Sequence, residues 1–481
     1  MSNNLLKNQG SVVPLCVDLD GTLIHSDLLF ESLLLLIKRN PLYLFLIPLW
    51  LLKGKATLKA EIARRVELNA AALPYVEPFV AWLAQQKALG RPLWLVTASD
   101  QRLAEAVAQH VGLFDGVMGS DGRDNLKGAH KAEHLVQRFG ERGFDYCGNH
   151  HADLAVWSHA RSAIVVNGSA SLEASARTLT PVEQVFAPQG QFAKHVLKAL
   201  RVHQWAKNAL IFVPLAAAHQ LTNPASLLSS LLAFVAFSLC ASSVYLLNDM
   251  LDLEADRQHP RKCKRPFAAG TLSLQFGLVA APMLLLAALA ISLVLPWKFL
   301  AVLAAYYVAT LAYSFVLKRM VMIDVLTLAG LYTVRIVAGA AATAIPLSFW
   351  LLLFAIFMFL SLAIVKRYAE LHATRLRGQL KASGRGYQVE DLVLLQSLGS
   401  SSGYISILVL ALYVNSPDIS ALYSHPKFVW MLCPIMLYWV SRVWMRTHRG
   451  HMHDDPLVFA LKDRISLLTA AAAAVVLWLA V

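Results

Sequence analysis

Long apolar runs fill this chain from about residue 192 to its C-terminus. An apolar run of about 20 residues crosses a ~30 Å hydrocarbon core as a helix, since a helix rises about 1.5 Å per residue. Inside a bilayer the backbone must satisfy its own hydrogen bonds, so the runs predict an all-α, multi-pass membrane bundle of about nine transmembrane helices. We place these helices at residues 208–220, 227–248, 272–295, 299–317, 323–344, 347–365, 398–414, 427–445 and 465–481.

The sequence before these runs has the composition of a globular protein. Of the 481 residues only 15% are charged and 57% are apolar, whereas soluble proteins carry about 25% charged residues. We therefore expect two parts, a soluble domain at 1–190 and a membrane domain at 195–481. The net charge of +13 comes mostly from loops beside apolar helices, which favours membrane topology over nucleic acid as its explanation. Five scattered cysteines predict no disulfide framework and suit a reducing compartment.

The loops between the predicted membrane helices differ strongly in charge. The alternate loops at 250–271, 317–323, 366–392 and 441–464 hold eighteen Lys and Arg, and the opposite loops hold only Lys298 and Lys427. Basic loops stay in the cytoplasm. We therefore predict an inner-membrane protein whose basic loops and soluble domain face the cytoplasm and whose C-terminus lies outside.

Polar motifs follow short apolar runs in the N-terminal part. Residues 12–19 lead into DLDGT, which contains Asp18 and Asp20, and residues 92–96 lead into Thr97. A buried strand that delivers polar groups at its C-terminal end is the usual place for a site in an α/β sheet. The pattern predicts an α/β, Rossmannoid domain with a site at these strand ends.

These motifs resemble those of the haloacid dehalogenase (HAD) superfamily of phosphatases, over roughly residues 12–170. The resemblance implies a HAD-like domain at 1–190 with a helical cap at about 27–90. It implies that Asp18 is the nucleophile that takes the phosphoryl group and that Asp20 is the general acid/base.

The resemblance also implies how phosphate is held. Thr97 would bind it and Lys127 would neutralise it, with Lys131 the less favoured choice. Mg²⁺ would be held by Asp18, Asp20 and Asp153.

The last HAD motif departs from the family pattern. Asn149 follows Gly148 where the family has Asp, which removes one negative charge from the expected metal site. A non-catalytic or regulatory HAD domain is therefore an alternative.

Residues 28–52 consist of two apolar halves interrupted by the sequence KRNP. Each half is too short to span a bilayer, and one crossing would separate the two parts of the HAD site. We interpret this stretch as a helical cap or hairpin that packs on the domain or rests on the bilayer surface.

A cluster of acids followed by bases occupies residues 248–270, directly after an apolar run. Asp249, Asp252 and Asp256 have the spacing i, i+3 and i+7 and would share one helical face. Carboxylates gathered at a membrane boundary need a cation between them, and Mg²⁺ takes oxygen ligands and shares them with substrate phosphates. The segment predicts a diphosphate site.

This segment resembles the first acidic motif of the UbiA-type intramembrane prenyltransferase superfamily, and within it most resembles the decaprenyl-phosphate phosphoribosyltransferases. The motifs RVHQWAKN, YSFVLKRMVMID and KRYAEL indicate the same subgroup, over residues 195–481. The resemblance implies transfer of 5-phosphoribose from phosphoribosyl diphosphate to a polyprenyl phosphate, with Mg²⁺. The HAD domain would then dephosphorylate the lipid product.

The implied site residues fall into two sets. Asp249 and Asp252 are the residues on which catalysis would depend. The residues implied to hold Mg²⁺ and the leaving diphosphate are Asn248, Asp249, Asp252 and Asp256. Those implied to bind substrate are Lys207, Asn208, Lys262, Arg265, Tyr313, Lys318, Asp324 and Arg335.

Two of these residues bear on the choice of substrate. Arg335 lies too deep in its helix to reach water easily, so it needs an anion or a carboxylate partner. Aromatic prenyltransferases generally have a second aspartate-rich motif, which is reduced here to Asp324. An aromatic-acceptor prenyltransferase that uses an isoprenyl diphosphate is the alternative.

Overall fold

A computed structural model describes residues 13–121, 125–188, 190–380, 385–416, 423–452 and 455–481. The described chain forms two compact units. The N-terminal unit contains the residues up to Leu200 together with Tyr245–Ala280, and the helical unit contains Arg201–Val244 and Ala281–Val481. Helix α11 (Pro224–Leu251) contributes residues to both units.

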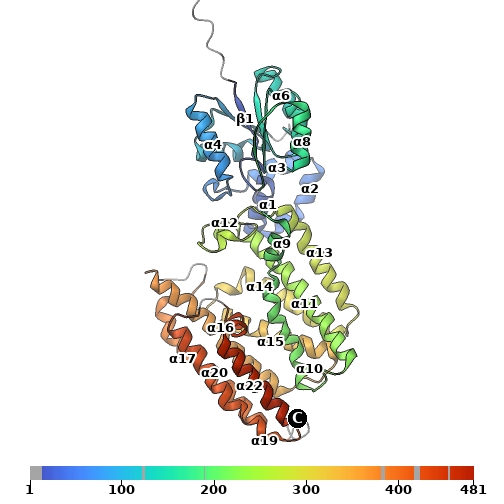
Figure 1. The fold of residues 1–481 in the computed structure, drawn as a ribbon, viewed down its shortest axis with the longest axis vertical. Helices are drawn as coiled ribbons and strands as arrows, with labels where there is room; N and C mark the ends of the chain where they lie inside the picture. The colour runs from blue at the N-terminus through green and yellow to red at the C-terminus, as the bar shows by residue number, and fades with distance from the viewer. Residues whose placement is uncertain (1–12, 122–124, 189, 381–384, 417–422, 453–454) are drawn as a thin grey trace, which may run out of the picture. The chain divides into compact units, whose positions relative to one another are not determined.

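The N-terminal unit is built on a parallel sheet, in which Figure 1 labels β1. Its six described strands run in the order β3-β2-β1-β4-β5-β6. Leu15 of β1 pairs with Leu93 of β2 on one side and with Asp145 of β4 on the other. The loops that follow these three strands therefore leave the same edge of the sheet. The predicted α/β fold is confirmed. The strands are β1 (Leu15–Val17), β2 (Leu93–Asp100), β3 (Gly116–Ser120), β4 (Asp145–Gly148), β5 (Ala163–Val166) and β6 (Val182–Phe186).

Helices cover both faces of this sheet because successive strand residues point to opposite sides. Leu15 and Val17 pack with Leu83 on one face, and Cys16 packs with Leu135 on the other. The covering helices are α4 (Glu77–Ala88), α5 (Gln101–Val111), α6 (Ala129–Phe139), η3 (His151–Asp153), α7 (Leu154–Trp157) and α8 (Ala170–Leu179).

A helical insertion separates β1 from α4. Its first helix ends at Arg39, and the side chain of Asn40 accepts a hydrogen bond from the Leu42 amide to begin the next element. The interruption expected near Pro41 is confirmed, and its physical reason is that proline cannot donate a backbone hydrogen bond. The insertion contains α1 (Leu28–Arg39), η1 (Pro41–Phe45), α2 (Ile47–Leu52), α3 (Lys55–Ala63) and η2 (Ala70–Ala72).

The acidic segment also lies in the N-terminal unit, and its helix is broken. Helix α11 ends at Leu251, and Asp252 is the N-cap of the short helix α12 (Leu253–Arg257). The prediction that Asp249, Asp252 and Asp256 share one face of a continuous helix is therefore wrong. The same unit contains α9 (Phe192–Leu200) and η5 (Lys262–Lys264).

The helical unit has fewer membrane-spanning helices than predicted. Among the described residues seven helices are long and apolar enough to cross a membrane, or eight if the bent pair α21 and α22 forms one span. The elements after α9 are η4 (Val202–Phe212), α10 (Val213–Ala217), α13 (Leu274–Ser292), α14 (Trp297–Phe315), η6 (Leu317–Arg319), α15 (Ile323–Thr343), α16 (Phe349–Leu376), η7 (Val389–Asp391), α17 (Leu392–Val414), α19 (Pro426–Val429), α20 (Leu432–His448), α21 (Pro456–Lys462) and α22 (Arg464–Ala480).

The first predicted helix of the series needs correction, and the last one corresponds to a described helix. Residues 208–220 form the end of η4 and then α10, whose 5 residues extend only ~8 Å. Lys207 and Asn208 are buried in η4, where Lys207 donates to Asp455 and Asn208 donates to Ser238. The last predicted helix, 465–481, lies in α22, which meets α21 at an angle of 81°.

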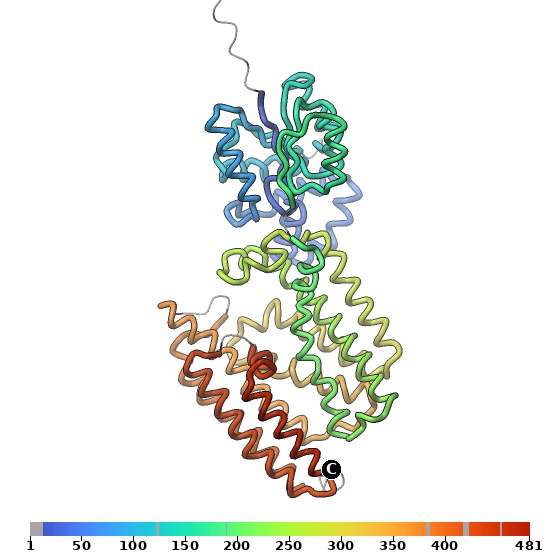
Figure 2. Tube along the Cα trace, viewed as in Figure 1, coloured from blue at the N-terminus to red at the C-terminus, as the bar shows by residue number. Residues whose placement is uncertain are grey.

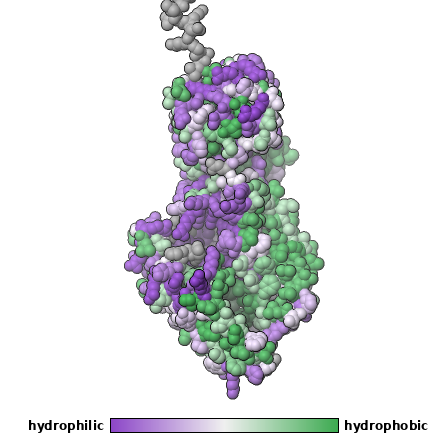
Figure 3. Space-filling model, viewed as in Figure 1, coloured by the Kyte–Doolittle hydropathy of each residue, from purple (hydrophilic) through white to green (hydrophobic). Residues whose placement is uncertain are grey.

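The spanning helices pack through small residues. A Cβ on Gly399 of α17 would lie 2.2 Å from the Trp444 ring of α20, so only glycine permits this approach. Helices α17, α20 and α22 run side by side in Figures 1 and 2. Side chains such as Leu286 and Leu293 are exposed, and Figure 3 shows extended hydrophobic surface over the helical unit, as a lipid-facing surface requires.

Candidate functional sites

Asp18 and Lys131 form the centre of the site in the N-terminal sheet. Asp18 follows β1, and its carboxylate lies 2.7 Å from the Lys131 Nζ of α6. Both side chains are buried. Burial raises the pKa of Asp18 to about 6, although the positive charge of Lys131 opposes that shift. The arrangement places a carboxylate beside a fixed cation, as a nucleophilic attack on an anionic phosphate would need.

Asp20 lies in the loop that follows β1 and contacts residues near the end of β2. Its Oδ1 accepts a hydrogen bond from the Leu28 amide at 2.8 Å, and its Oδ2 accepts one from Ser99 Oγ at 2.7 Å and a longer one from Thr97 Oγ1 at 3.4 Å. Burial raises the pKa of Asp20 to about 7, and the carboxylates of Asp27 and Asp18 shift it in the same direction. Such a pKa suits a group that gives and takes a proton near neutral pH.

Asp153 supports this site through Tyr146. The Tyr146 hydroxyl contacts Lys131 Nζ at 2.7 Å and donates to Asp153 Oδ1 at 3.2 Å. The other Asp153 oxygen accepts the backbone N–H groups of Asn149 and His150. Asp153 was predicted as a metal ligand, and here both of its oxygens bind protein groups.

The lysine that lies beside Asp18 is Lys131 and not Lys127, the residue preferred from the sequence. Lys131 belongs to the buried face of α6 and contacts Asp18, whereas Lys127 precedes α6 and is exposed. The side chain of Asn149 lies against the loop after β1, because a Cβ on Gly21 would be 2.0 Å from Asn149 Nδ2. The residue that departs from the HAD pattern therefore lies beside the loop that contains Asp18 and Asp20.

Two acids of the 248–270 segment converge on one arginine. Arg265 Nη1 lies 3.0 Å from Asp249 Oδ1 and 2.6 Å from Asp256 Oδ2, and both carboxylates are buried. Asp252 is half-buried and lies 3.6 Å from Lys38 of α1. Asn248, one residue before Asp249, is half-buried in the last turns of α11, and Lys262 is exposed at the start of η5.

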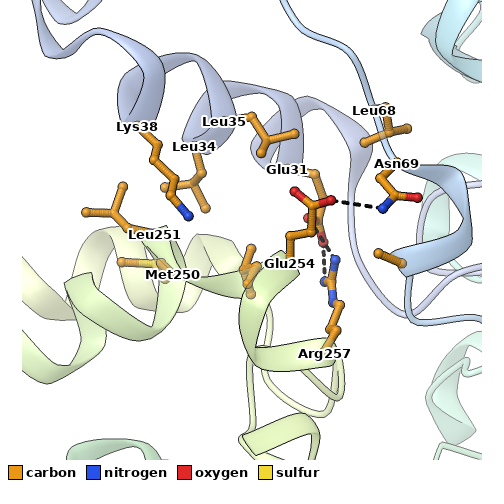
Figure 4. A pocket seen from close by; sticks show the side chains of 12 residues that line it. Glu31, Leu34, Leu35, Lys38, Leu68, Asn69, Met250, Leu251, Glu254 and Arg257 are labelled. Carbon is orange, nitrogen blue, oxygen red and sulfur yellow. Dashed lines mark hydrogen bonds and ion pairs between the residues drawn. The ribbon is translucent and has the colours of Figure 1, made fainter. Parts of the chain in front are cut away.

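Helix α1 of the insertion contacts this segment directly (Figure 4). Arg257 donates from Nη2 to Glu31 Oε1 at 2.5 Å and from Nη1 to Glu31 Oε2 at 3.1 Å. Asn69 Nδ2 donates to Glu254 Oε1 at 2.9 Å. These contacts join the insertion after β1 to the acidic motif within the N-terminal unit.

The helical unit contains a buried polar cluster around Asp455. Its Oδ2 accepts hydrogen bonds from Lys207 at 2.6 Å, Tyr332 at 2.9 Å and Lys366 at 3.1 Å. Burial lowers the pKa of Lys207 to about 8, and Lys366 acts in the same direction while Asp455 opposes it. Although burial alone would raise it, the pKa of Asp455 is held well below its usual range by Lys366 and Lys207.

Asn208 and Arg335 form a second buried pair in the helical unit. Arg335 Nε donates to Asn208 Oδ1 at 2.8 Å, and its Nη2 donates to the Tyr306 hydroxyl at 3.3 Å. The guanidinium also lies 5.3 Å from the Phe237 ring centre. Arg335 was expected to need an anion or a carboxylate partner. In the part of the chain that the structure describes, its contacts are an amide, a hydroxyl and aromatic rings, which leaves the expectation of a bound anion untested.

Asp324 anchors a third polar group. Its Oδ2 accepts from Arg367 Nε at 2.8 Å, and its Oδ1 accepts from the Tyr387 hydroxyl. Arg385 lies 3.6 Å from the same carboxylate and donates to the Tyr313 hydroxyl at 3.2 Å. Asp324 thus orients cationic side chains, and Tyr313 joins this group through Arg385. Lys318 is half-buried in η6.

Two family profiles match the chain. The UbiA prenyltransferase family profile matches residues 209–468, more than half of the chain, and the haloacid dehalogenase-like hydrolase profile matches residues 15–157. This chain belongs to the UbiA prenyltransferase family. It is a multi-pass UbiA-family membrane transferase with an N-terminal HAD-like hydrolase domain.

Relatives of this UbiA-family protein differ in how much of the chain they cover. The protein y4nM of Sinorhizobium fredii, which is uncharacterized, is 37% identical over 462 residues, covering 95% of this chain and 89% of y4nM. The decaprenyl-phosphate phosphoribosyltransferase of Mycobacterium tuberculosis is 34% identical over 295 residues, covering 60% of this chain and 94% of the relative. A solved structure of a UbiA homolog from Archaeoglobus fulgidus bound to GPP and Mg²⁺ matches with a TM-score of 0.46 and 15% identity, over 59% of this chain and 99% of that one.

The residues of this UbiA-family protein fit Mg²⁺ in their chemistry but are not gathered around a metal position. Among the described residues no group of three or more His, Cys, Asp or Glu is arranged to hold a metal ion. Asp249 and Asp256 nevertheless offer oxygen ligands that already converge on the single positive charge of Arg265. Mg²⁺ commonly takes one or two carboxylates plus substrate phosphates, so this pair suits it. Asp18 and Asp20 are a second oxygen pair, in the HAD domain.

Several buried polar residues were missed as site residues in the sequence. Asp455 had a readable signal, since an acid directly before a proline often caps a helix, and it does cap α21. Ser99 follows Thr97 by two residues and so shares its side of β2. Arg385 and Tyr387 lie in a polar loop, where nothing in the local pattern indicates a partner in α15.

Proposed function

We propose that this protein transfers 5-phosphoribose from phosphoribosyl diphosphate to a polyprenyl phosphate, and that its HAD domain removes the 5-phosphate of the product. The similarity to decaprenyl-phosphate phosphoribosyltransferase over 94% of that relative supports the first step. The buried cations of the helical unit support it as well, because lysine and arginine are the side chains that bind phosphate oxygens.

The environment of Asp324 is the observation that carries the choice of substrate. An aromatic prenyltransferase would use a second acidic motif to bind metal. Here Asp324 is fully buried and bound by Arg367 and Tyr387, with Arg385 nearby. We propose that the Asp324 carboxylate positions the guanidinium groups of Arg367 and Arg385. Guanidinium groups suit an additional phosphate on the substrate. This arrangement favours a phosphoribosyl donor over an isoprenyl diphosphate.

In the transferase step, Asp249 and Asp256, with Asn248 and Asp252 near them in sequence, would hold Mg²⁺. When bound, Mg²⁺ would neutralise the leaving diphosphate. The phosphate oxygen of the lipid attacks C1 of the ribose as the C1–diphosphate bond breaks. That oxygen is already anionic, so the chain's own task is to orient the reactants and to neutralise charge. Within the N-terminal unit, the cations proposed for this task are Lys262 and Arg265. Within the helical unit, Lys207, Lys318 and Arg335 are proposed to bind phosphate.

In the second step, Asp18 attacks the 5-phosphate while Lys131 neutralises it. Asp20 gives a proton to the ribose oxygen that leaves, and then takes one from the water that hydrolyses the aspartyl phosphate. Thr97 and Ser99 hold Asp20 in position for both transfers. A cytoplasmic orientation of both sites is part of the proposal, since phosphoribosyl diphosphate is soluble in water.

Lipid mass spectrometry tests both steps on the full chain in liposomes with phosphoribosyl diphosphate and polyprenyl phosphate. We expect the wild type to form a polyprenyl-phosphoribose without the 5-phosphate, Asp18→Asn to accumulate its 5-phosphate ester, and Asp249→Asn to form neither. Glu254→Gln, in the same acidic segment, is the matched control and should retain transfer. Product formation from isoprenyl diphosphate and an aromatic acid instead would overturn the proposal for the donor, and an unchanged lipid product in Asp18→Asn would overturn the second step.

A further inference from the structure

The insertion in the HAD domain carries a short, strongly apolar segment, η1–α2 (Pro41–Leu52). One side of it is fixed to the protein, because Trp50 is buried against Leu36 of α1 and Ile62 of α3. The Tyr43 and Trp50 rings lie 6.1 Å apart, and the guanidinium of Arg65 lies 4.9 Å from the Trp50 ring centre. The segment is therefore an ordered part of the domain.

The opposite side of the segment is exposed and apolar. Leu42, Phe45 and Leu52 are 67%, 76% and 85% exposed. Leu44, Leu46, Leu49 and Leu51 are exposed as well. A contiguous apolar patch of this kind on a protein surface marks a binding surface. At 12 residues and ~18 Å the segment is too short to cross a ~30 Å hydrocarbon core.

Positively charged residues flank the segment on both sides. Residues 32–60 contain five cations and no acid. Lys38 and Arg39 precede the segment, and Lys53 and Lys55 follow it, all exposed. An apolar surface bordered by cations is the composition of segments that lie in a membrane interface, where the cations meet anionic lipid headgroups.

The position of α1 brings this segment close to the end of a candidate membrane span. Leu34, Leu35 and Lys38 of α1 line a small pocket together with Met250 and Leu251 (Figure 4). Lys38 also lies 3.6 Å from Asp252, the residue directly after the membrane span α11. Pro41 follows Lys38 by only three residues, which span at most roughly 10 Å of chain, so the segment begins near the residue that meets the end of that span.

We infer that η1–α2 inserts into the surface of the bilayer that α11 crosses, and that it anchors the HAD domain there without spanning. The inference does not depend on the proposed reactions. Leu42, Phe45 and Leu52 enter the region between headgroups and acyl chains, and Lys38, Arg39, Lys53 and Lys55 remain among the headgroups.

The test measures lipid contact in the full chain, reconstituted in nanodiscs of phosphatidylcholine and phosphatidylglycerol. Cys263 and Cys433, which are partly exposed, are first changed to serine. Cys16, Cys147 and Cys240 are buried, and burial raises the pKa of the Cys16 and Cys147 thiols, so these residues stay unlabelled. A fluorophore sensitive to its environment is then attached at Phe45→Cys or Leu52→Cys.

Leu89→Cys is the matched control, because Leu89 is 77% exposed at the end of α4 on the same domain. We expect doxyl-labelled lipids to quench the labels at 45 and 52 at least about twofold more than the label at 89, with blue-shifted emission. Equal quenching at the three positions would overturn the inference. Disulfide formation between two copies through Phe45→Cys, without lipid quenching, would overturn it as well and assign the surface to a second copy of the chain.

Discussion

The ion pair between Glu31 and Arg257 allows a quantitative test of how the HAD domain supports the acidic motif. The Glu31 and Arg257 side chains are only 4% and 9% exposed. Arg257 also donates from Nε to the Ala268 carbonyl at 3.0 Å. Changing Glu31→Gln removes the negative charge and leaves a buried arginine without its partner, which costs about 3 to 5 kcal/mol.

This cost should appear as local opening of residues 253–270. Because each 1.4 kcal/mol is a factor of ten, a loss of about 3 kcal/mol raises the open population roughly 10²-fold. Hydrogen exchange measured by mass spectrometry on the full chain in nanodiscs reports that opening. A good reporter is the Gln258 amide, which donates to the Glu254 carbonyl at the end of α12.

A control and a double mutant separate the pair from general effects. Glu173 and Arg177 form an exposed pair on one helix, and such pairs contribute about 0.3–0.5 kcal/mol. Glu173→Gln should therefore change hydrogen exchange at residues 253–270 by well under tenfold. Combining Glu31→Gln with Arg257→Gln removes the unpaired charge and should recover much of the protection. Protection at 253–270 that is no lower in Glu31→Gln than in Glu173→Gln would refute the reasoning.

Two further predictions concern lysines. Lys131→Met should lower phosphatase activity on the lipid product about 10²-fold or more, because it removes the cation beside Asp18. Lys127→Met, at an exposed position, should keep activity within a few-fold of the wild type. Equal losses in the two variants would contradict the role proposed for Lys131. Burial lowers the pKa of Lys207 to about 8, so transferase kcat/KM should fall as pH rises above about 8, and Lys207→Arg should extend activity to higher pH. Between about pH 8 and 10.5 the unfolded chain binds more protons at Lys207 than the folded chain does, so the free energy of unfolding should not fall as pH rises. Thermal melting measured over this pH range checks that the loss of activity is not a loss of folded protein. A Lys207→Arg profile identical to that of the wild type would count against this role.

Local pattern predicted the elements and chemistry that depend on neighbours in sequence. The strand before Asp18, the interruption at Pro41 and the membrane character of the C-terminal part are of this kind. The choice between Lys127 and Lys131 was also readable, because Lys131 lies four residues before the buried Leu135 and shares its helical face.

What the sequence could not provide were contacts that depend on chain reversal. Arg265 reaches Asp249 because the chain turns back after α12, and Asp455 meets Lys207 across 248 residues. Asp252 does not share the face of Asp249 because it occupies the break between α11 and α12, where it contacts Lys38 of the HAD domain. Hydrophobic periodicity carries no information on such partners.

Helix α1 gives the fusion of the two domains a structural reason. At its first residue, the Leu28 amide is held by Asp20, the proposed acid/base of the HAD site. Three residues later Glu31 binds Arg257, and near its end Lys38 approaches Asp252. The intervening rise is only about 15 Å, and a helix of this length is stiff. The HAD domain is thus part of the support of the acidic motif, so its loss should disturb that motif even where its own hydrolytic chemistry is not required.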